Sequence, residues 1–150
     1  MKIKEKLIDS ATTMFLKYGV KSVSMDDMAR LMGMSKKTIY THIDNKKGLV
    51  STVIKTFIKK EQREIKKISK NAGNAIEEMA MIADMVLKTL RIMKPKLTFD
   101  IKKYHPQLWN FIEEVHFNFM KETIRKNIIR GQKEGLYRDC LLYTSPSPRD

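Results

Sequence analysis

Apolar residues recur every three or four positions along most of the chain, which is the period of amphipathic helices. The first such stretch runs from Ile3 to Tyr18 and closes at Gly19. A second follows Ser24, which together with Asp27 resembles a capping box, and continues to Gly33. Ser35 can cap a third helix over residues 36–43. The pattern therefore predicts three short helices in the first 45 residues.

The remainder of the chain continues the helical pattern. It predicts a long, lysine-rich amphipathic helix to about residue 69, and then a helix over 75–93 that is apolar on most sides and is expected to lie inside a bundle. Pro95 is expected to end that helix, and a short segment over 97–104 leads to Pro106. A long helix is predicted over 107–133, closing near Gly135, with these residues facing inward: Trp109, Ile112, Val115, Phe119, Ile124 and Ile128. We therefore predict an all-α protein.

The second and third predicted helices are separated by a tight turn at Gly33 and Met34, as in a helix-turn-helix unit. If Ile39 and Ile43 face inward, every other residue of the third helix carries a hydrogen-bond donor in its side chain. A helix that enters the major groove needs short donors toward base edges and cations or hydroxyls toward phosphates. Lys46 and Lys47 follow at the start of the next helix, whose free N–H groups also favour phosphate.

Charge supports a polyanionic partner. The chain has 30 Lys and Arg against 17 Asp and Glu, for a net charge of +13 and a pI near 9.8. Residues 1–70 hold 17 basic and 7 acidic residues, a net charge of +10, whereas residues 71–150 hold 13 and 10, a net charge of +3. Nucleic acid is the first expectation. A basic helical module that binds anionic membrane or a protein partner is the alternative.

The stretch from Ile8 to Leu49 resembles the N-terminal domain of the tetracycline-repressor (TetR) family of bacterial transcription regulators. The run SMDDMARLMGMSKKTIYTHIDNKKGLV is similar to that family's second helix, turn, recognition helix and entry into the fourth helix, and IDSATTMFLKYGVKSVSM is similar to its first helix and linker. The chain departs from the family at Ile43, where an aromatic residue is common, and at Gly48, which weakens the first turn of the fourth helix by about 1 kcal/mol relative to Ala.

The resemblance implies DNA-contacting roles for this region. Tyr40 and His42 match positions that meet the DNA backbone, Lys46 matches a phosphate-contacting lysine, and the base-facing positions are matched by Lys37, Thr38 and Thr41. Together with the analysis of the exposed helix face, the predicted DNA-binding set is Ser35, Lys36, Lys37, Thr38, Tyr40, Thr41, His42, Lys46 and Lys47. We expect a double-stranded DNA operator as the partner.

For the remaining residues, the resemblance implies a helical domain that encloses a small-molecule effector and dimerises through its last two helices. We expect a DNA-binding domain over 1–46 and an incomplete effector and dimerisation domain over 47–139 of a cytoplasmic, ligand-responsive repressor that acts as a homodimer. The candidate pocket residues are Met79, Met85, Met93, Trp109 and Phe111. Met and aromatic residues at helical spacing are more often core, and this alternative stays open.

The sequence contains little that indicates a catalytic site or a metal site. Glu113 and His116 form the Glu-x-x-His unit of di-iron bundles, but no second such unit is present. The single cysteine, Cys140, excludes an internal disulfide framework and a Cys-based zinc site. No stretch reaches the apolar length of a membrane span. We therefore expect no enzyme activity, no cofactor and no metal.

The last residues, 140–150, differ in character from the rest of the chain. They read CLLYTSPSPRD and contain Pro146 and Pro148, two of the four prolines in the chain. This run resembles the translation of a transposase adapter used in short-read library preparation, joined where the genuine reading frame was cut. The alternative is a flexible, polyproline-like tail. The first interpretation predicts an artefactual tail and a natural protein that continues past Asp139.

Overall fold

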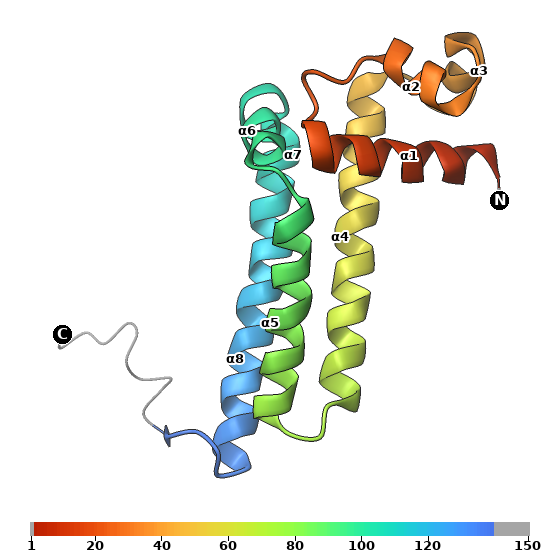
Figure 1. Ribbon diagram of the computed structural model, residues 1–150. Helices are drawn as coiled ribbons and strands as arrows, with labels where there is room; N and C mark the ends of the chain where they lie inside the picture. The colour runs from red at the N-terminus through yellow and green to blue at the C-terminus, as the bar shows by residue number, and fades with distance from the viewer. Residues whose placement is uncertain (1, 140–150) are drawn as a thin grey trace.

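The computed structural model describes residues 2–139, and within that range it contains helices and no strand. The tail 140–150, including Cys140, lies outside the described residues. Four helices account for the first half of the chain: α1 (Ile3–Tyr18), α2 (Met25–Met32), α3 (Lys36–Tyr40) and α4 (Lys46–Asn71). Helix α4 runs the length of the body, α1 crosses it, and α2 and α3 lie at one end (Figure 1). We call α1 to α3 the head and the rest the body.

The body continues with α5 (Ala75–Ile92), α6 (Pro95–Tyr104), α7 (Pro106–Phe111), the π-helical segment η1 (Ile112–Phe117) and α8 (Asn118–Lys133). Helices α4, α5 and α8 run along one another as the long elements, and α6 and α7 lie near the crossing with α1 (Figure 1). The all-α prediction is confirmed, and α1, α2, α4 and α5 lie within two residues of their predicted bounds.

The prediction of one uninterrupted helix over 107–133 was wrong. Its middle, Ile112–Phe117, is a π-helix, which is wider than an α-helix. The extra residue in this turn changes which side chains face inward. Val115 and Ile124, predicted to face inward, are exposed, whereas His116 is half-buried and Asn127 is buried. The period of 3.6 residues used for the prediction does not hold across this segment.

Two other elements differ from their predicted form. Helix α3 ends at Tyr40 rather than at Ile43, because the N–H groups of Thr41 and His42 bond to carbonyls three residues earlier, which tightens the last turn. The segment around 97–104 is a helix, α6, which starts at Pro95. Proline suits the first helical position because no hydrogen bond is needed from its nitrogen there.

One hydrophobic core joins the head to the body. From the head it contains Leu7, Ala11 and Phe15 of α1. From the body it contains Leu49, Val50 and Val53 of α4. Residues of α6, α7 and η1 complete it, among them Leu97, Ile101 and Ile112. Helix α1 contacts both α4 and α6. The head is therefore packed on the body along the length of α1.

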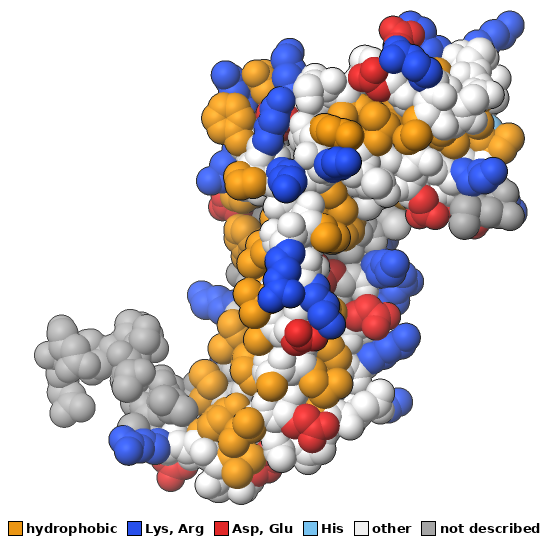
Figure 2. Space-filling model, viewed as in Figure 1, with side chains coloured by type: hydrophobic (Ala, Val, Ile, Leu, Met, Phe, Trp, Pro, Cys, Tyr) orange, Lys and Arg blue, Asp and Glu red, His pale blue; other side chains and the backbone are white. Residues whose placement is uncertain are grey.

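The prediction that the helix over 75–93 is buried on most sides was also wrong. One face of α5 packs inward through Ala75, Glu78 and Ile82. Another face is an exposed apolar stripe at helical spacing, made of Ile76, Ala80, Ala83 and Leu87. Figure 2 shows hydrophobic side chains along the part of the body that lies away from the head. Burial of this stripe needs a further partner, which the described residues do not supply.

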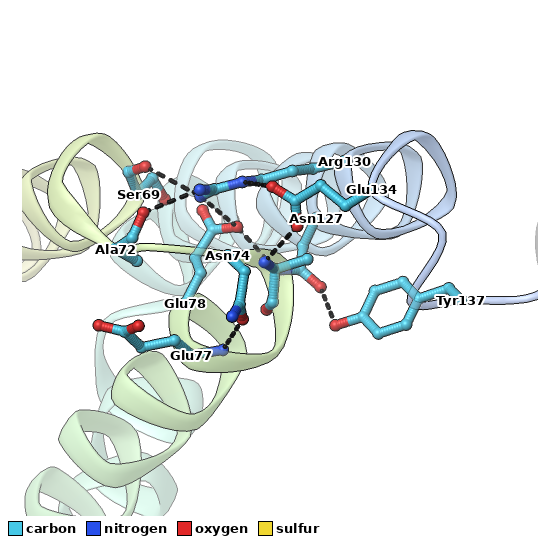
Figure 3. A network of polar contacts seen from close by, with 10 residues as sticks. Ser69, Ala72, Asn74, Glu77, Glu78, Asn127, Arg130, Glu134 and Tyr137 are labelled. Carbon is cyan, nitrogen blue, oxygen red and sulfur yellow. Dashed lines mark hydrogen bonds and ion pairs between the residues drawn. The ribbon is translucent and has the colours of Figure 1, made fainter.

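A polar network closes the end of the body opposite the head (Figure 3). Asn127 Nδ2 donates to the Ala75 carbonyl at 2.9 Å and to Glu78 Oε1 at 2.7 Å. Arg130 Nη2 donates to the Ala72 carbonyl at 2.8 Å. The network ties the end of α8 to the α4–α5 connection.

Across the described residues, no helix combines the length and apolar composition that crossing a bilayer requires.

Candidate nucleic-acid interface and internal cavity

Capping interactions fix the α2–turn–α3 unit. Ser24 Oγ accepts the N–H of Asp27 at 3.0 Å, while Asp27 Oδ2 accepts the N–H of Ser24 at 2.8 Å. The backbone donor, followed by the Ser24 side chain, lowers the pKa of the Asp27 carboxyl. Helix α2 ends at Gly33, whose φ of 63° lies in the left-handed region that glycine adopts without strain. Ser35 then caps α3 by accepting the N–H of Thr38 at 3.1 Å.

The predicted DNA-binding residues lie on α3, on the residues that flank it, and at the start of α4. Ile39 is fully buried, which anchors the helix to the head. The exposed members of the set are Ser35, Lys36, Lys37, Tyr40, Thr41 and Lys47, and the half-buried members are Thr38, His42 and Lys46. The structure therefore brings cations, hydroxyls and an imidazole together at the tip of the head. Such a surface can donate to phosphates and to base edges.

Two lysines of this set have intramolecular partners. Lys36 Nζ lies 3.1 Å from Asp26 Oδ1, in an exposed pair. Lys46 Nζ donates to the carbonyl of Val20 at 2.7 Å, so its ammonium is directed at the α1–α2 connection. Burial, and then the neighbouring Lys21, lower the pKa of Lys46. In this conformation, a phosphate contact by Lys46 would require its ammonium to leave Val20.

The same α1–α2 connection is held by the body. Asp100, on α6, accepts the N–H groups of Val20 and Lys21 through Oδ2, both at 2.9 Å. The Lys94 N–H donates to the Leu16 carbonyl at 3.0 Å. Residues of α6 thus hold the last turn of α1 and the connection to α2. Sequence reasoning missed Asp100, since nothing near it in the chain marks it as a partner of the head.

A cavity of about 390 Å³ lies beside this junction. It is lined by one residue of the head, Leu16, and by residues of α4, α5, α6, α7, η1 and α8. Its volume falls in the range of small-molecule sites, about 300 to 1,000 Å³. The walls are mostly aliphatic and aromatic and include Phe57, Val86, Leu97, Ile101, Ile112 and Met120.

The structure distributes the predicted pocket residues unevenly. Met93 and Trp109 line the cavity. Phe111 lines a second, smaller hollow of about 150 Å³ together with Lys47, Ser51, Lys55, His105, Gln107 and Leu108. Met79 and Met85 line neither of these two hollows. Sequence reasoning missed Glu61 and the lining role of His116, because their placement depends on how α4 packs against η1.

Glu61 and His116 are the charged or chargeable residues of the cavity lining. His116 Nε2 lies 3.4 Å from Glu61 Oε1, and their side chains are 15% and 13% exposed. Within the described part of the chain, the buried atoms without a hydrogen-bond partner are His116 Nδ1 and Gln62 Nε2. His116 of η1 is thus paired with Glu61 of α4. The residues described contain no group of three or more His, Cys, Asp or Glu arranged to hold a metal.

Comparisons with known proteins agree with this architecture. Residues 7–53 match the family model described as bacterial regulatory proteins, tetR family. The uncharacterized HTH-type transcriptional regulator YvaF of Bacillus subtilis is 27% identical over 106 residues, which cover 70% of this chain and 56% of YvaF. The chain thus spans little more than half the length of that relative.

A second relative matches the head. IcaR, the negative transcriptional regulator of the biofilm operon icaADBC in Staphylococcus aureus, is 34% identical over 53 residues, or 35% of this chain and 28% of IcaR. A crystal structure of a transcriptional regulator from Saccharomonospora viridis in complex with choline superposes with a TM-score of 0.77 at 18% identity, covering 91% of this chain and 73% of that one. The head of this chain, over residues 7–53, is thus similar to that of bacterial regulatory proteins of the tetR family.

Proposed function

We propose that the protein is a ligand-responsive, DNA-binding transcription regulator that acts as a repressor. The observation that carries this proposal is the capped α2–turn–α3 unit, with Ile39 buried beneath it and a row of donors exposed on α3. We assign DNA binding to residues 1–46 and effector binding and dimerisation to residues 47–139. IcaR, similar over the head, is named as a negative regulator, which favours repression over activation.

The DNA contacts are divided by chemistry. Lys37, Thr38 and Thr41 face bases, and Tyr40, His42, Lys46 and Lys47 hold the DNA backbone, with the Lys46 ammonium leaving the Val20 carbonyl to do so. Ser35 and Lys36 lie at the N-terminal turn of α3, where free N–H groups favour a phosphate. Two copies of α3 would occupy successive major grooves, so the complete protein acts as a homodimer. The exposed stripe on α5 is apolar surface that further helices or a second copy can cover.

The effector site is the cavity between head and body. It is lined both by Leu16 of the head and by Leu97, Thr98 and Ile101 of α6, the helix whose Asp100 holds the α1–α2 connection. A ligand that displaces α6 would therefore displace the head and change the spacing between the two recognition helices. The Saccharomonospora viridis structure, which contains choline, shows that a protein of this fold can accommodate a small molecule.

The test is binding of the protein to DNA from its own upstream region. If each head engages roughly four phosphates, a dimer should show a slope of about −7 in a plot of log K against log salt concentration. Thr41→Ala should relax base preference, whereas Lys47→Ala should weaken binding to all sequences about equally.

Anionic vesicles test the alternative of a basic membrane-binding module. A regulator prefers its operator to unrelated DNA and shows this preference with or without vesicles. A chain that binds vesicles, shows no preference among DNA sequences and is unaffected by Thr41→Ala would overturn the proposal.

A further inference from the structure

The cavity has one carboxylate in walls that carry no Lys or Arg. Among its lining residues, all of them in the described part of the chain, Glu61 is the acidic one and His116 is the one other titratable group. The remaining polar side-chain groups of the lining are the indole N–H of Trp109 and the hydroxyls of Thr89 and Thr98, and Thr89 Oγ1 already donates to the Met85 carbonyl at 3.2 Å.

Glu61 lies among mostly apolar lining residues, and His116 is its one chargeable neighbour in that lining. Its side chain is 13% exposed, and its one charged partner within the described residues is His116 Nε2 at 3.4 Å, a long distance for a charge-assisted hydrogen bond. A ligand group that donates at a shorter distance would be a better partner for this carboxylate than the imidazole at 3.4 Å. A carboxylate removed from water without donors or a cation is costly, so a ligand that supplies either would be favoured.

We propose, as a consequence of the effector site proposed above, that this cavity selects monocationic amphiphiles. The ligand class is a molecule with one protonated or quaternary ammonium group and an apolar chain or ring system. Its ammonium group would lie against Glu61, and its apolar part would fill the space among Ile54, Val86, Leu97 and Met120. Thus Glu61 is the specificity-determining residue.

Aromatic rings near the carboxylate suit the same ligand. Phe57 lies one helical turn before Glu61 on α4, and Phe117 follows His116 on η1; both line the cavity. Ring faces attract ammonium groups, most strongly where water is excluded. Lys102 shows this attraction at the cavity wall, with Nζ 4.7 Å from the ring centroid of Trp109. The π-helical turn at 112–117 brings His116 and Phe117 to the cavity together.

Other ligand charges fit less well. A carboxylate or sulfate would face Glu61 with no Lys or Arg in the lining to pair with it. A neutral apolar molecule would fill the walls and leave Glu61 unsatisfied. The net charge of +13 does not oppose a cation inside the cavity, because exposed charges are screened over about 10 Å at moderate salt.

Ligand binding can be measured through the fluorescence of Trp109, because it is the one tryptophan in the sequence and it lines the cavity. Its fluorescence is titrated, in the full chain, with decyltrimethylammonium and decanoate below their micelle concentrations and with 1-decanol below its solubility limit. These three probes share the apolar chain and differ in the charge of the head group. We expect the cation to bind at least about tenfold more tightly than decanoate.

Glu61→Gln keeps the side-chain shape and removes the charge. We expect it to reduce the preference for the cation over decanoate to about twofold or less, with decanol binding unchanged. Glu64→Gln is the matched control, because Glu64 lies on α4 and pairs with Lys67 at an exposed site outside the cavity lining. It should leave all three affinities unaltered.

Three results would overturn the inference: decanoate binding as tightly as the cation, a preference that survives Glu61→Gln, or no binding of any probe. If Glu61→Gln does not fold, the comparison of the three probes on the unaltered chain decides alone. The titration contains no DNA, so its failure is distinct from failure of the regulator assignment, which the operator measurement tests separately.

Discussion

Asp100 of α6 holds the backbone of Val20, eighty residues earlier in the chain, by accepting its N–H at 2.9 Å. The same carboxylate oxygen accepts the N–H of Lys21 at 2.9 Å, and Asp100 and Val20 are each 1% exposed. Two donors of the head are therefore satisfied by one buried side chain of the body. Because α6 also lines the cavity, this contact links the cavity wall to the head.

Asp100→Ala should lower the free energy of unfolding by about 2 to 4 kcal/mol, since it leaves a buried N–H group without an acceptor. Urea unfolding measures this loss. Asp84→Ala, which removes an exposed carboxylate from α5, should change the unfolding free energy by no more than about 0.5 kcal/mol. Equal effects of the two substitutions would show that the Asp100 contacts do not stabilise the head on the body.

Gly19→Ala should also destabilise the junction. Gly19 has φ of 80° and ψ of −170°, a conformation that is open essentially to glycine. A Cβ atom there would lie 2.6 Å from Asp100 Oδ2, so the alanine would both strain the backbone and push the carboxylate away. We expect a loss of about 1 to 3 kcal/mol in the free energy of unfolding.

Gly33→Ala is the matched control for the steric part of this effect. Gly33 also has positive φ, but a Cβ atom there would meet nothing within 4 Å. It should be less harmful than Gly19→Ala, and thermal unfolding of both variants makes the comparison. A larger loss at Gly33 would mean that the clash with Asp100 is not important.

The sequence predicted the head more fully than the body, for physical reasons. Ser24, Asp27, Gly33 and Ser35 act on their own neighbours in the chain, so their roles as caps and turns can be recognised from local spacing. The contacts of Asp100 with Val20 and of Glu61 with His116 join distant segments, and no local pattern specifies them. Which of the candidate pocket residues line the cavity, Met93 and Trp109 but not Met79 or Met85, likewise depends on packing between helices.

The π-helical segment illustrates the limit of periodicity. The run from Ile112 to Phe117 contains no glycine or proline that would mark a change of helix type. The predicted inward face was therefore continued across it at 3.6 residues per turn, which placed Val115 and Ile124 inside although both are exposed. The stripe on α5 was misjudged for a related reason: apolar spacing does not reveal whether a partner covers each face.

His105 should make the stability of the protein depend on pH. Burial, and then the charges of Lys47 and Lys46, lower the pKa of His105 below 6.5. The unfolded chain therefore binds a proton at His105 more readily than the folded chain does. Stability should fall as the pH is lowered through 6.5 toward the folded-state pKa, and His105 should contribute no such dependence well above 6.5.

The measurement is urea unfolding at pH 7.5 and pH 5.5 for the unaltered chain and for His105→Gln. Glutamine does not titrate, so the variant should lose less stability between the two pH values than the unaltered chain does. An identical loss in both proteins would show that the acid sensitivity arises from other groups.

Asn127 should contribute strongly to the stability of the end of the body that lies opposite the head. It is 1% exposed, donates to the Ala75 carbonyl and to Glu78, and accepts the hydroxyl of Tyr137 at 2.9 Å (Figure 3). Asn127→Ala would remove all three bonds and leave the buried Glu78 carboxylate without its nearest donor. We expect a loss of about 2 to 4 kcal/mol in the free energy of unfolding.

Asn118→Ala separates this network from the general effect of changing an asparagine on α8. Asn118 is exposed and donates to the carbonyl of Glu114, four residues earlier on η1, at 2.6 Å, so its loss should cost less than about 1 kcal/mol. Hydrogen exchange adds a local measurement. In Asn127→Ala, the amides around the α4–α5 connection should exchange faster, while those of α2 and α3 should keep their rates because the network does not reach the head. Faster exchange throughout the chain would instead mean that Asn127 supports the whole fold rather than this end of it.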